Sequence, residues 1–191
     1  MAAIVSAPLR WQEVKEIVQR GKSDVTALSS IGRCAWDYAD YTEYCSQLKE
    51  KWATVGDNMR AKLFNAPTRA IPDGKLEVDN DLDTTSSTCY VLVMKNEFPY
   101  SFAPEDQISH VNIWCSSQGL DDSIVEQLIA ERLPCDEYVW FVNPPQLRSV
   151  KTLWHCHIFM KNLKSTAKLS LPGQAELFDV EAYAARSKPP S

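Results

Sequence analysis

Four short runs of apolar and aromatic residues constrain the fold of this chain more than any other feature. They are CYVLVMK at 89–95, SHVNIWC at 109–115, YVWFVN at 138–143 and TLWHCHIFMK at 152–161. Short runs rich in valine, isoleucine and aromatic residues are typical of β-strands. The sequence therefore predicts that the second half of the chain is built around a β-sheet.

Helical spacing of apolar residues marks four further segments, at 11–21, 35–52, 121–133 and 175–185. The predicted order of elements is α-α-β-β-α-β-β-α. This order indicates an α+β fold with a mainly antiparallel sheet and helices packed on one face. A chain of 191 residues that is 45% hydrophobic suits one domain with a sizeable core, so we expect residues 1–191 to form a single domain.

Two segments lack a regular pattern. Residues 56–88 contain two prolines, two glycines and the acidic run EVDNDLD, which is typical of a mobile lid or loop. Residues 187–191 are predicted to form a flexible tail.

One face of the predicted helix at 35–52 carries an aromatic stripe. The stripe has helical spacing and consists of Tyr41, Tyr44, Cys45, Leu48 and Trp52. A stripe of this kind more often packs in the core than binds a ligand, and we interpret it as core.

Charge is distributed unevenly in this acidic chain, whose net charge is −5. Residues 138–175 contain no Asp or Glu. The basic residues of this segment are Arg148, Lys151, Lys161, Lys164 and Lys168. A basic segment either binds phosphates of a nucleic acid or is an ordinary solvated surface, and charge alone slightly favours the second reading.

Several classes of protein do not fit the sequence. No apolar stretch is long enough to span a bilayer, and the N-terminus lacks the basic start of a secretory signal. The six cysteines contain no CxxC pair and are expected to be reduced, as in a cytoplasmic protein. The motifs of P-loop, dinucleotide-binding, GxSxG and HExxH enzymes are absent, so an activated substrate is favoured over ATP chemistry.

The chain has three histidines, and two of them stand two residues apart in the run at 152–161. His155 and His157 share one face of a strand, because alternate residues point to the same side. His110 lies in another predicted strand, and all three converge if these strands are neighbours. The pattern fits a proton-transfer site, the polar wall of a pocket, a metal site or hydrogen-bonded core residues. A metal is the weaker reading, because no further ligand is suitably spaced.

The stretch YVWFVNPPQLRSVKTLWHCHIFMK resembles the C-terminal signature of a fungal family named after N-acetylglucosamine-induced protein, a domain of unknown function. The signature reads approximately W-F-x-N-x-x-x-L-x-S-V-x-x-x-x-H-x-H. The matching residues are Trp140, Phe141, Asn143, Leu147, Ser149, Val150, His155 and His157. The resemblance extends to NEFPY at 96–100 and to HVNIW at 110–114, which are similar to a second block of the family.

Two departures from the family pattern indicate a specialised member. Trp154 stands where the family usually has an acidic residue, and Glu97-Phe98 replaces Asp-Trp. Divergent members resemble arginine-containing cyclodipeptide synthases of fungal secondary metabolism. This resemblance implies a transferase that takes arginyl-tRNA and a second aminoacyl-tRNA and forms a cyclo-arginyl-Xaa diketopiperazine, with no cofactor and no metal.

Roles follow for individual residues under this reading. His157, and less strongly His155, are the predicted bases, and Asn143 is a donor to a carbonyl oxygen. A covalent route needs a nucleophile, for which Ser149 is preferred to Cys156. The predicted substrate-binding residues are Glu97, Tyr100, His110, Trp114, Asp121, Asp122 and Trp154, with Glu97 first for the guanidinium group. The predicted tRNA-binding residues are Arg148, Lys151, Lys161 and Lys164.

Two other classes remain open. One is a small-molecule lyase, isomerase or hydrolase that uses the same histidine pocket without tRNA. The other is a non-catalytic regulatory or binding protein of sugar response, which the family's name permits. The sequence leaves the second amino acid and the oligomeric state undetermined.

Overall fold

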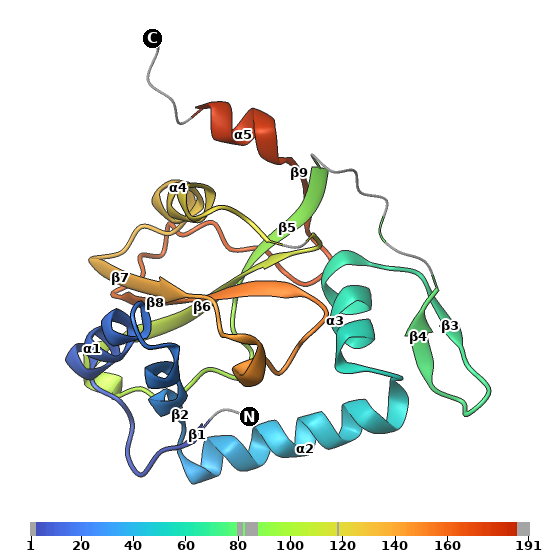
Figure 1. The fold of residues 1–191 in the computed structure, drawn as a ribbon, viewed down its shortest axis with the longest axis horizontal. Coiled ribbons are helices and arrows are strands. Elements are labelled where there is room, and N and C mark those ends of the chain that lie inside the picture. Colours follow the sequence, from blue (N-terminus) through green and yellow to red (C-terminus); the bar gives the residue numbers. More distant parts are fainter. Residues whose placement is uncertain (1–2, 80–81, 83–87, 118, 187–191) are drawn as a thin grey trace.

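Five strands of one antiparallel sheet organise the computed structural model, which describes residues 3–79, 82, 88–117 and 119–186 (Figure 1). The strands are β1 (Ala3–Ile4), β2 (Gly32–Arg33), β3 (Thr68–Ala70), β4 (Leu76–Val78), β5 (Thr88–Lys95), β6 (Ile108–Cys115), β7 (Glu137–Phe141), β8 (Trp154–Lys161) and β9 (Glu176–Asp179). The α-helices are α1 (Trp11–Gly21), α2 (Ala35–Lys51), α3 (Val55–Phe64), α4 (Asp122–Arg132) and α5 (Val180–Arg186). Short 3-10 helices are η1 (Val25–Ser30), η2 (Pro104–Asp106) and η3 (Pro145–Leu147).

The main sheet has the strand order β7-β8-β6-β5-β9, and every neighbouring pair in it is antiparallel. All four strands predicted from the sequence are members of this sheet. The predicted α+β class with a mainly antiparallel sheet is therefore confirmed. The described residues add a parallel pair of two-residue strands, β1 and β2, which the sequence did not predict.

Helices cover both faces of the sheet, whereas the sequence analysis placed them on one face. Helices α4 and α5 lie on one side, and α1, α2 and α3 lie on the other (Figure 1). The one-face prediction was wrong because the central strands are buried on both sides. In β8, for example, all residues from His155 to Met160 are buried. A strand buried on both sides cannot show the alternation that distinguishes an inner face from a solvated one.

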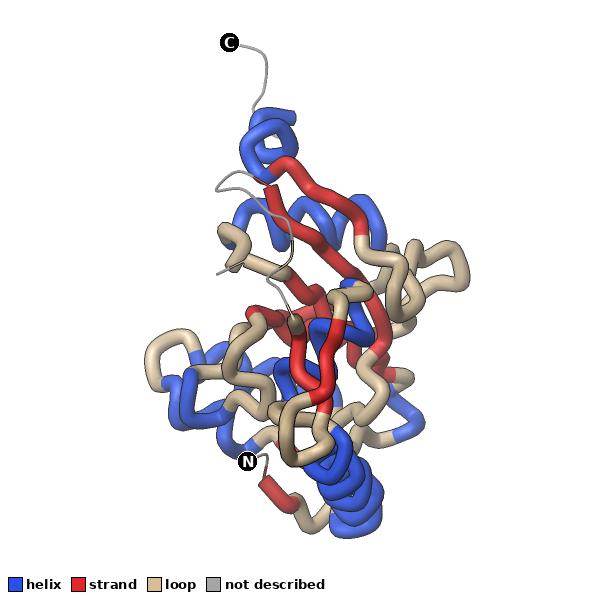
Figure 2. Tube along the Cα trace, turned by 90° about the vertical axis from the view of Figure 1, so that its right-hand side faces the viewer, coloured by secondary structure: helices blue, strands red, loops and turns tan. Residues whose placement is uncertain are grey.

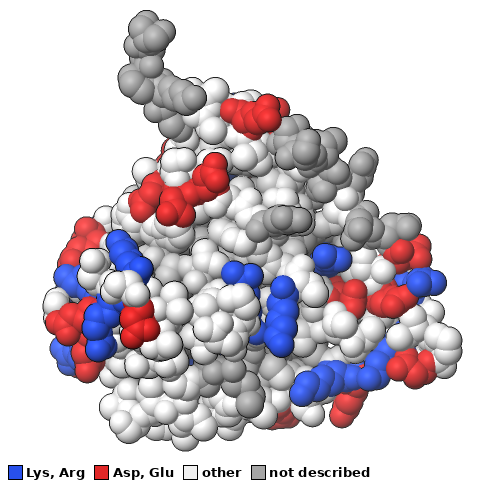
Figure 3. All heavy atoms as spheres, in the orientation of Figure 1, with Lys and Arg blue, Asp and Glu red and all other residues white. Residues whose placement is uncertain are grey.

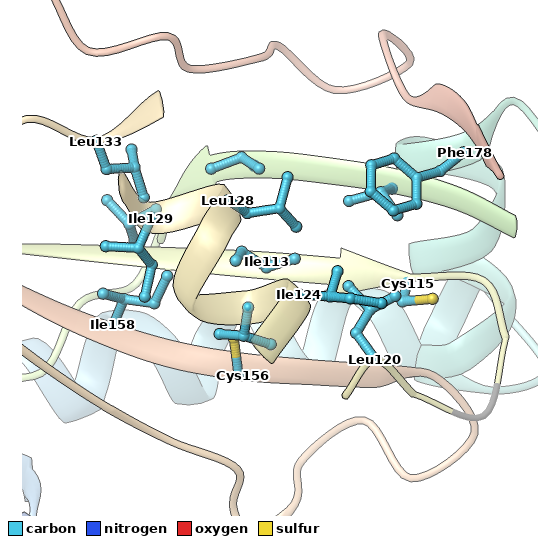
Figure 4. Close-up of a cluster of buried hydrophobic side chains, with 14 of the residues drawn as sticks. Ile113, Cys115, Leu120, Ile124, Leu128, Ile129, Leu133, Cys156, Ile158 and Phe178 are labelled. Atoms are coloured by element: carbon cyan, nitrogen blue, oxygen red, sulfur yellow. The ribbon is translucent and has the colours of Figure 1, made fainter. Parts of the chain in front are cut away.

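The face under α4 is filled by an apolar core. Ile113, Cys156 and Ile158 point from the sheet towards Ile124 and Leu128 of α4 (Figure 4). All five side chains are almost completely buried. Burying an aliphatic side chain of this size contributes roughly 1.5–3 kcal/mol, so this face supplies much of the fold's stability.

The segment at 56–88, expected to be a lid or loop, begins with regular structure. Helix α3 starts after Thr54, whose hydroxyl oxygen accepts a hydrogen bond from the Asp57 amide at 3.0 Å, and it ends at Asn65 in the left-handed conformation. Strands β3 and β4 then form a hairpin beside α3. This hairpin faces the viewer in Figure 2. The rest of the segment, at 80–81 and 83–87, lies outside the described residues, as does the predicted tail at 187–191.

The helix predicted at 175–185 is only partly helical. Its first residues form β9, which pairs with β5 through Cys89 and Phe178, and α5 begins only at Val180. Strand β5 would otherwise be an unpaired edge, and Phe178 is buried against Tyr183 in this arrangement. Tertiary pairing therefore overrides the helical pattern.

All six cysteines lie in the described part of the chain and are free thiols, as predicted. Among the described helices, none has both the length and the hydrophobicity needed to cross a membrane.

Candidate active site: a buried cavity lined by histidines

A cavity of about 100 Å³ lies between α2, α3 and the face of the sheet opposite α4. Its wall includes residues from the main sheet, from β2, from α2 and α3, and from the β5–β6 and β7–β8 connections. The residues used below are Arg33, Tyr41, Tyr44, Cys45, Leu48, Glu97, Tyr100, Asn112, Trp114, Asn143, Ser149, His155 and His157. A volume of this size holds several water molecules or a small acyl group.

The pairing of β6 with β8 brings the three histidines together. Its register sets Asn112 opposite His157 and Trp114 opposite His155, with all four side chains towards the cavity. His110 Nε2 lies 2.9 Å from His157 Nδ1. The expectation that the two histidines of β8 share one face beside an antiparallel neighbouring strand is confirmed.

Hydrogen-bonding groups surround both ring nitrogens of His110 and of His157. The Tyr100 backbone N–H donates to His110 Nδ1 at 3.3 Å, and His110 Nε2 faces both His157 Nδ1 and Asn96 Nδ2, the latter at 3.3 Å. Asn112 Nδ2 lies 3.2 Å from His157 Nδ1. Asn143 Nδ2 lies 3.0 Å from His157 Nε2 and donates to the Tyr100 hydroxyl oxygen at 3.5 Å.

His155 is arranged differently. Its Nδ1–H donates to the Leu153 carbonyl oxygen at 3.1 Å, which leaves the lone pair on Nε2. Within the part of the chain that the structure describes, Nε2 has no hydrogen-bond partner. The ring stacks on Trp114 with centroids 4.3 Å apart. Of the three rings, His155 is the one whose acceptor nitrogen is unengaged.

Burial keeps all three rings neutral at physiological pH. It lowers the pKa of His155 to about 4, and it lowers the pKa of His110 and of His157 well below the ordinary value. The neighbouring histidines and the positive charge of Arg33 act in the same direction on His157. The cavity therefore holds uncharged imidazoles that are able to accept a proton.

Sequence reasoning missed Arg33, which brings a positive charge to the cavity. Its side chain is buried, with the guanidinium carbon 4.2 Å from the Tyr41 ring centroid and 5.0 Å from that of Tyr100. One guanidinium nitrogen donates to the Phe98 carbonyl oxygen. Burial lowers the pKa of Arg33, but an arginine stays charged. An isolated arginine in IGRCAW gives no local signal, because its partners are distant in sequence.

The aromatic stripe at 35–52 was interpreted as core, which holds for the buried Trp52, whereas its other four residues face the cavity. Tyr41, Tyr44, Cys45 and Leu48 all line it. Burial raises the pKa of Tyr41 to about 12, and its side chain hydrogen-bonds that of Ser149. Helical spacing identifies which residues face inward, but it cannot distinguish a filled core from a hollow one.

Two predicted residues lie at the rim. Glu97 is about 40% exposed and accepts a hydrogen bond from Lys62, with which it forms an ion pair. Ser149 is exposed and, among the described residues, forms no hydrogen bond with a histidine.

Cys156 is fully buried on the opposite face, where burial raises the pKa of its thiol to about 12, which disfavours it as a nucleophile.

Three predicted substrate-binding residues lie away from the cavity. Trp154 precedes His155 on β8 and therefore points to the other face, where it packs against the core beneath α4. Asp121 and Asp122 are exposed at the N-terminus of α4, on that same side of the sheet. Acidic residues at this position stabilise a helix, which accounts for both without a ligand.

The predicted tRNA-binding residues do not form one patch. Arg148 and Lys151 adjoin Ser149 before β8, whereas Lys161 ends β8 and Lys164 follows it, about 23 Å away along the strand. Lys164 pairs with Asp136, and Lys161 lies opposite Glu137 in the sheet. On the face seen in Figure 3, basic and acidic side chains are mixed at the left and right edges, and a few basic side chains stand apart near the centre.

The histidine cluster is not arranged for a metal. Among the described residues, no group of three or more His, Cys, Asp or Glu side chains is placed to hold an ion. Hydrogen bonds within the cluster use the acceptor nitrogens of His110 and His157.

Fold and site define an α+β protein with a cavity of neutral histidines behind a helical cover. Residues 10–161 match the family described as protein of unknown function (DUF3605), and the chain belongs to this family. It is 25% identical over 168 residues to an uncharacterized protein, YPL067C, of Saccharomyces cerevisiae, covering 79% of this chain and 78% of that protein. It is 20% identical over 205 residues to N-acetylglucosamine-induced protein 1 of Candida albicans, covering 92% and 78%.

A solved structure supports the fold. The crystal structure of HTC1 superposes with a TM-score of 0.51 at 19% identity, covering 93% of this chain and 94% of that one. At this identity the likeness concerns the fold alone.

Proposed function

We propose that the protein is an aminoacyl-tRNA-dependent cyclodipeptide synthase that joins arginine to a second amino acid as a cyclo-arginyl-Xaa diketopiperazine. The observation that carries this proposal is His155 Nε2, an unengaged acceptor on a neutral, buried imidazole that lines the cavity. The relatives that the chain matches are fungal, and a role in fungal secondary metabolism is part of this proposal.

In the proposed reaction His155 Nε2 accepts a proton from the α-amino group of one aminoacyl ester. The amine attacks the carbonyl carbon of the second ester, a C–N bond forms, and the C–O bond to the tRNA ribose breaks. The ribose oxygen leaves with the proton. The same events on the dipeptidyl ester close the ring, so two aminoacyl-tRNAs give one diketopiperazine and two tRNAs without oxidant or ATP.

His157 is proposed as a positioning residue, a change from its role as principal base in the sequence analysis. Both of its ring nitrogens already have partners, Nδ1 facing His110 and Nε2 facing the Asn143 amide nitrogen. Asn143 Nδ2, which lies beside His157 and the Tyr100 hydroxyl group, is the proposed donor to a carbonyl oxygen as negative charge develops there. Ser149 is exposed and, among the described residues, has no histidine base hydrogen-bonded to its hydroxyl group, which favours the direct route over a covalent one.

Glu97 is the proposed partner of the substrate guanidinium. Its carboxylate lies at the rim of the cavity, and its only cation among the described residues is Lys62, with which a substrate would compete. Arg148 and Lys151 are proposed to contact tRNA phosphates, because they flank residues of the cavity wall. Lys161 and Lys164 are weaker candidates, since acidic residues lie beside them.

The small volume of the cavity favours a second candidate, a lyase, isomerase or hydrolase acting on a small molecule at the same histidines. A third candidate, a non-catalytic protein of sugar response, rests on the name of the Candida relative alone.

Expression in a bacterial host with ordinary tRNAs, followed by mass spectrometry of the medium, tests the proposal. We expect cyclo-arginyl products that are absent from a strain producing the His155→Asn variant. The Trp154→Phe variant is the matched control, because its side chain is adjacent in sequence but lies on the opposite face. The proposal fails if the parent protein yields no such product.

A further inference from the structure

Two residues of the cavity wall each contain a buried polar atom without a hydrogen-bond partner. The atoms are Arg33 Nε, a donor, and Asn112 Oδ1, an acceptor. Buried polar groups are almost always hydrogen-bonded, so an unpaired donor and an unpaired acceptor in the wall of one cavity call for an explanation.

Arg33 is a buried cation without an acidic partner. Only 6% of the residue is exposed, and the described part of the chain offers it no ion pair. The nearby Asp37 carboxylate accepts a hydrogen bond from Ser101 instead. The contacts of Arg33 are two aromatic rings and one backbone carbonyl, which leave Nε available for an oxygen acceptor.

The orientation of Asn112 is fixed by its neighbours. Its Nδ2 donates to the Cys156 carbonyl oxygen at 3.0 Å and also approaches His157 Nδ1, which accepts. A flipped amide would set its oxygen against the Cys156 oxygen. Asn112 Oδ1 therefore stays an acceptor, buried in a residue that is 1% exposed.

We propose that these two atoms form a recognition site for an α-aminoacyl group, with the acyl oxygen bound by Arg33 and the α-amino group bound by Asn112 Oδ1. An α-aminoacyl group presents an oxygen acceptor and an N–H donor on adjacent carbons. These two groups complement the unpaired donor of Arg33 and the unpaired acceptor of Asn112. The inference rests on the proposed function, since it names the part of the aminoacyl ester that the cavity holds. In this arrangement the positive charge of Arg33 lies next to the reacting carbonyl group.

Calorimetric titration with three small probes tests the site without turnover. L-Argininamide has both groups, agmatine lacks the carbonyl, and 5-guanidinopentanamide lacks the α-amine. We expect the protein to bind argininamide at least about 10-fold more tightly than either of the others, because each missing group leaves a buried partner unpaired. A parallel series of leucinamide, isopentylamine and 4-methylpentanamide removes the guanidinium from the comparison.

Variants assign each preference to its residue. Arg33→Met should bind argininamide and agmatine equally, and Asn112→Leu should bind argininamide and 5-guanidinopentanamide equally. Circular dichroism checks their folding, and Arg33→Leu and Asn112→Ala replace any variant that fails to fold. The inference is overturned if the parent protein binds the members of each series equally or binds none at millimolar concentration.

The outcomes separate this inference from the proposed function. Probe preferences without any cyclodipeptide in the expression test would uphold the site and reject the synthase. A cyclodipeptide without probe preferences would do the reverse. Preferences in the leucine series alone would uphold the aminoacyl site and assign it to the second amino acid instead of arginine.

Discussion

The two faces of the five-stranded sheet are both covered by helices, but they are filled in different ways. On β8, Cys156, Ile158 and Met160 enter an apolar core under α4, whereas His155 and His157 enter a cavity under α2 and α3. Because strand side chains alternate, one strand supplies both. The α4 side is apolar throughout, whereas the opposite side combines two further apolar clusters with polar side chains around a cavity.

The largest effect is expected on activity, from a change confined to the cavity face. His155→Asn preserves approximate size and hydrogen bonding but removes the unengaged base, so turnover should fall about 100-fold or more. His157→Asn should lower turnover less, because His157 acts through its neighbours. Product formation by purified protein is the measurement, with Trp154→Phe expected to retain activity. Full turnover by both histidine variants would make the pair structural.

The opposite face should dominate stability. Leu128→Ala empties a fully buried site under α4 and should lower the free energy of unfolding by about 2–5 kcal/mol. Leu48→Ala enlarges a cavity that already exists and should cost less, roughly 1–2 kcal/mol. Urea unfolding of both variants measures the difference. Equal losses would remove the distinction between the two faces.

The pH dependence of stability should come from the cavity face, where all three histidines of the chain lie. The pKa of His155 is about 4 in the folded protein, against 6.5 for an ordinary histidine, so the unfolded chain binds the proton more tightly. Stability is therefore complete above pH 6.5 and is lost as the pH falls towards 4, by up to roughly 3 kcal/mol for this residue.

Urea unfolding at about pH 7 and about pH 4.5, on either side of the ordinary histidine pKa, measures that loss. His155→Asn is expected to reduce the difference between the two pH values, while carboxylates contribute equally to parent and variant. An unchanged difference would show that His155 is not held neutral by burial.

A smaller effect is expected at the rim of the cavity. Glu97→Gln keeps the shape of the side chain but removes its charge, so argininamide should bind about 10-fold more weakly. Lys62→Met is the matched control, because it removes the competing cation and should leave binding unchanged or tighter. Calorimetry distinguishes them, and a loss caused by Lys62→Met but not by Glu97→Gln would exclude Glu97 as the guanidinium site.

The smallest effects are expected from single surface charges. Lys151→Glu, beside the cavity wall, should weaken tRNA binding most at low salt and change the salt slope by roughly one unit. Lys161→Glu should also weaken binding, but less, because Glu137 lies opposite it. Filter binding at several salt concentrations is suitable. Affinity unaffected by either change would make the basic segment an ordinary solvated surface.

The sequence predicted the part of the site that depends on local periodicity. The spacing of His155 and His157 requires a shared face in a strand, and the apolar runs on both sides identify the sheet. Arg33 was missed, because it reaches the cavity through β2 and meets Tyr41 and Tyr100 only in the folded chain. Strand β9 was missed for a similar reason, since pairing with β5 determines its conformation.

The most direct test of the cavity's role is reconstitution with purified protein, arginyl-tRNA and a mixture of other aminoacyl-tRNAs, followed by mass spectrometry. We expect cyclo-arginyl products that disappear when ribonuclease is added first and when His155→Asn replaces the parent protein. Products that persist after ribonuclease treatment, or a parent protein that releases none from intact aminoacyl-tRNAs, would contradict the proposed synthase.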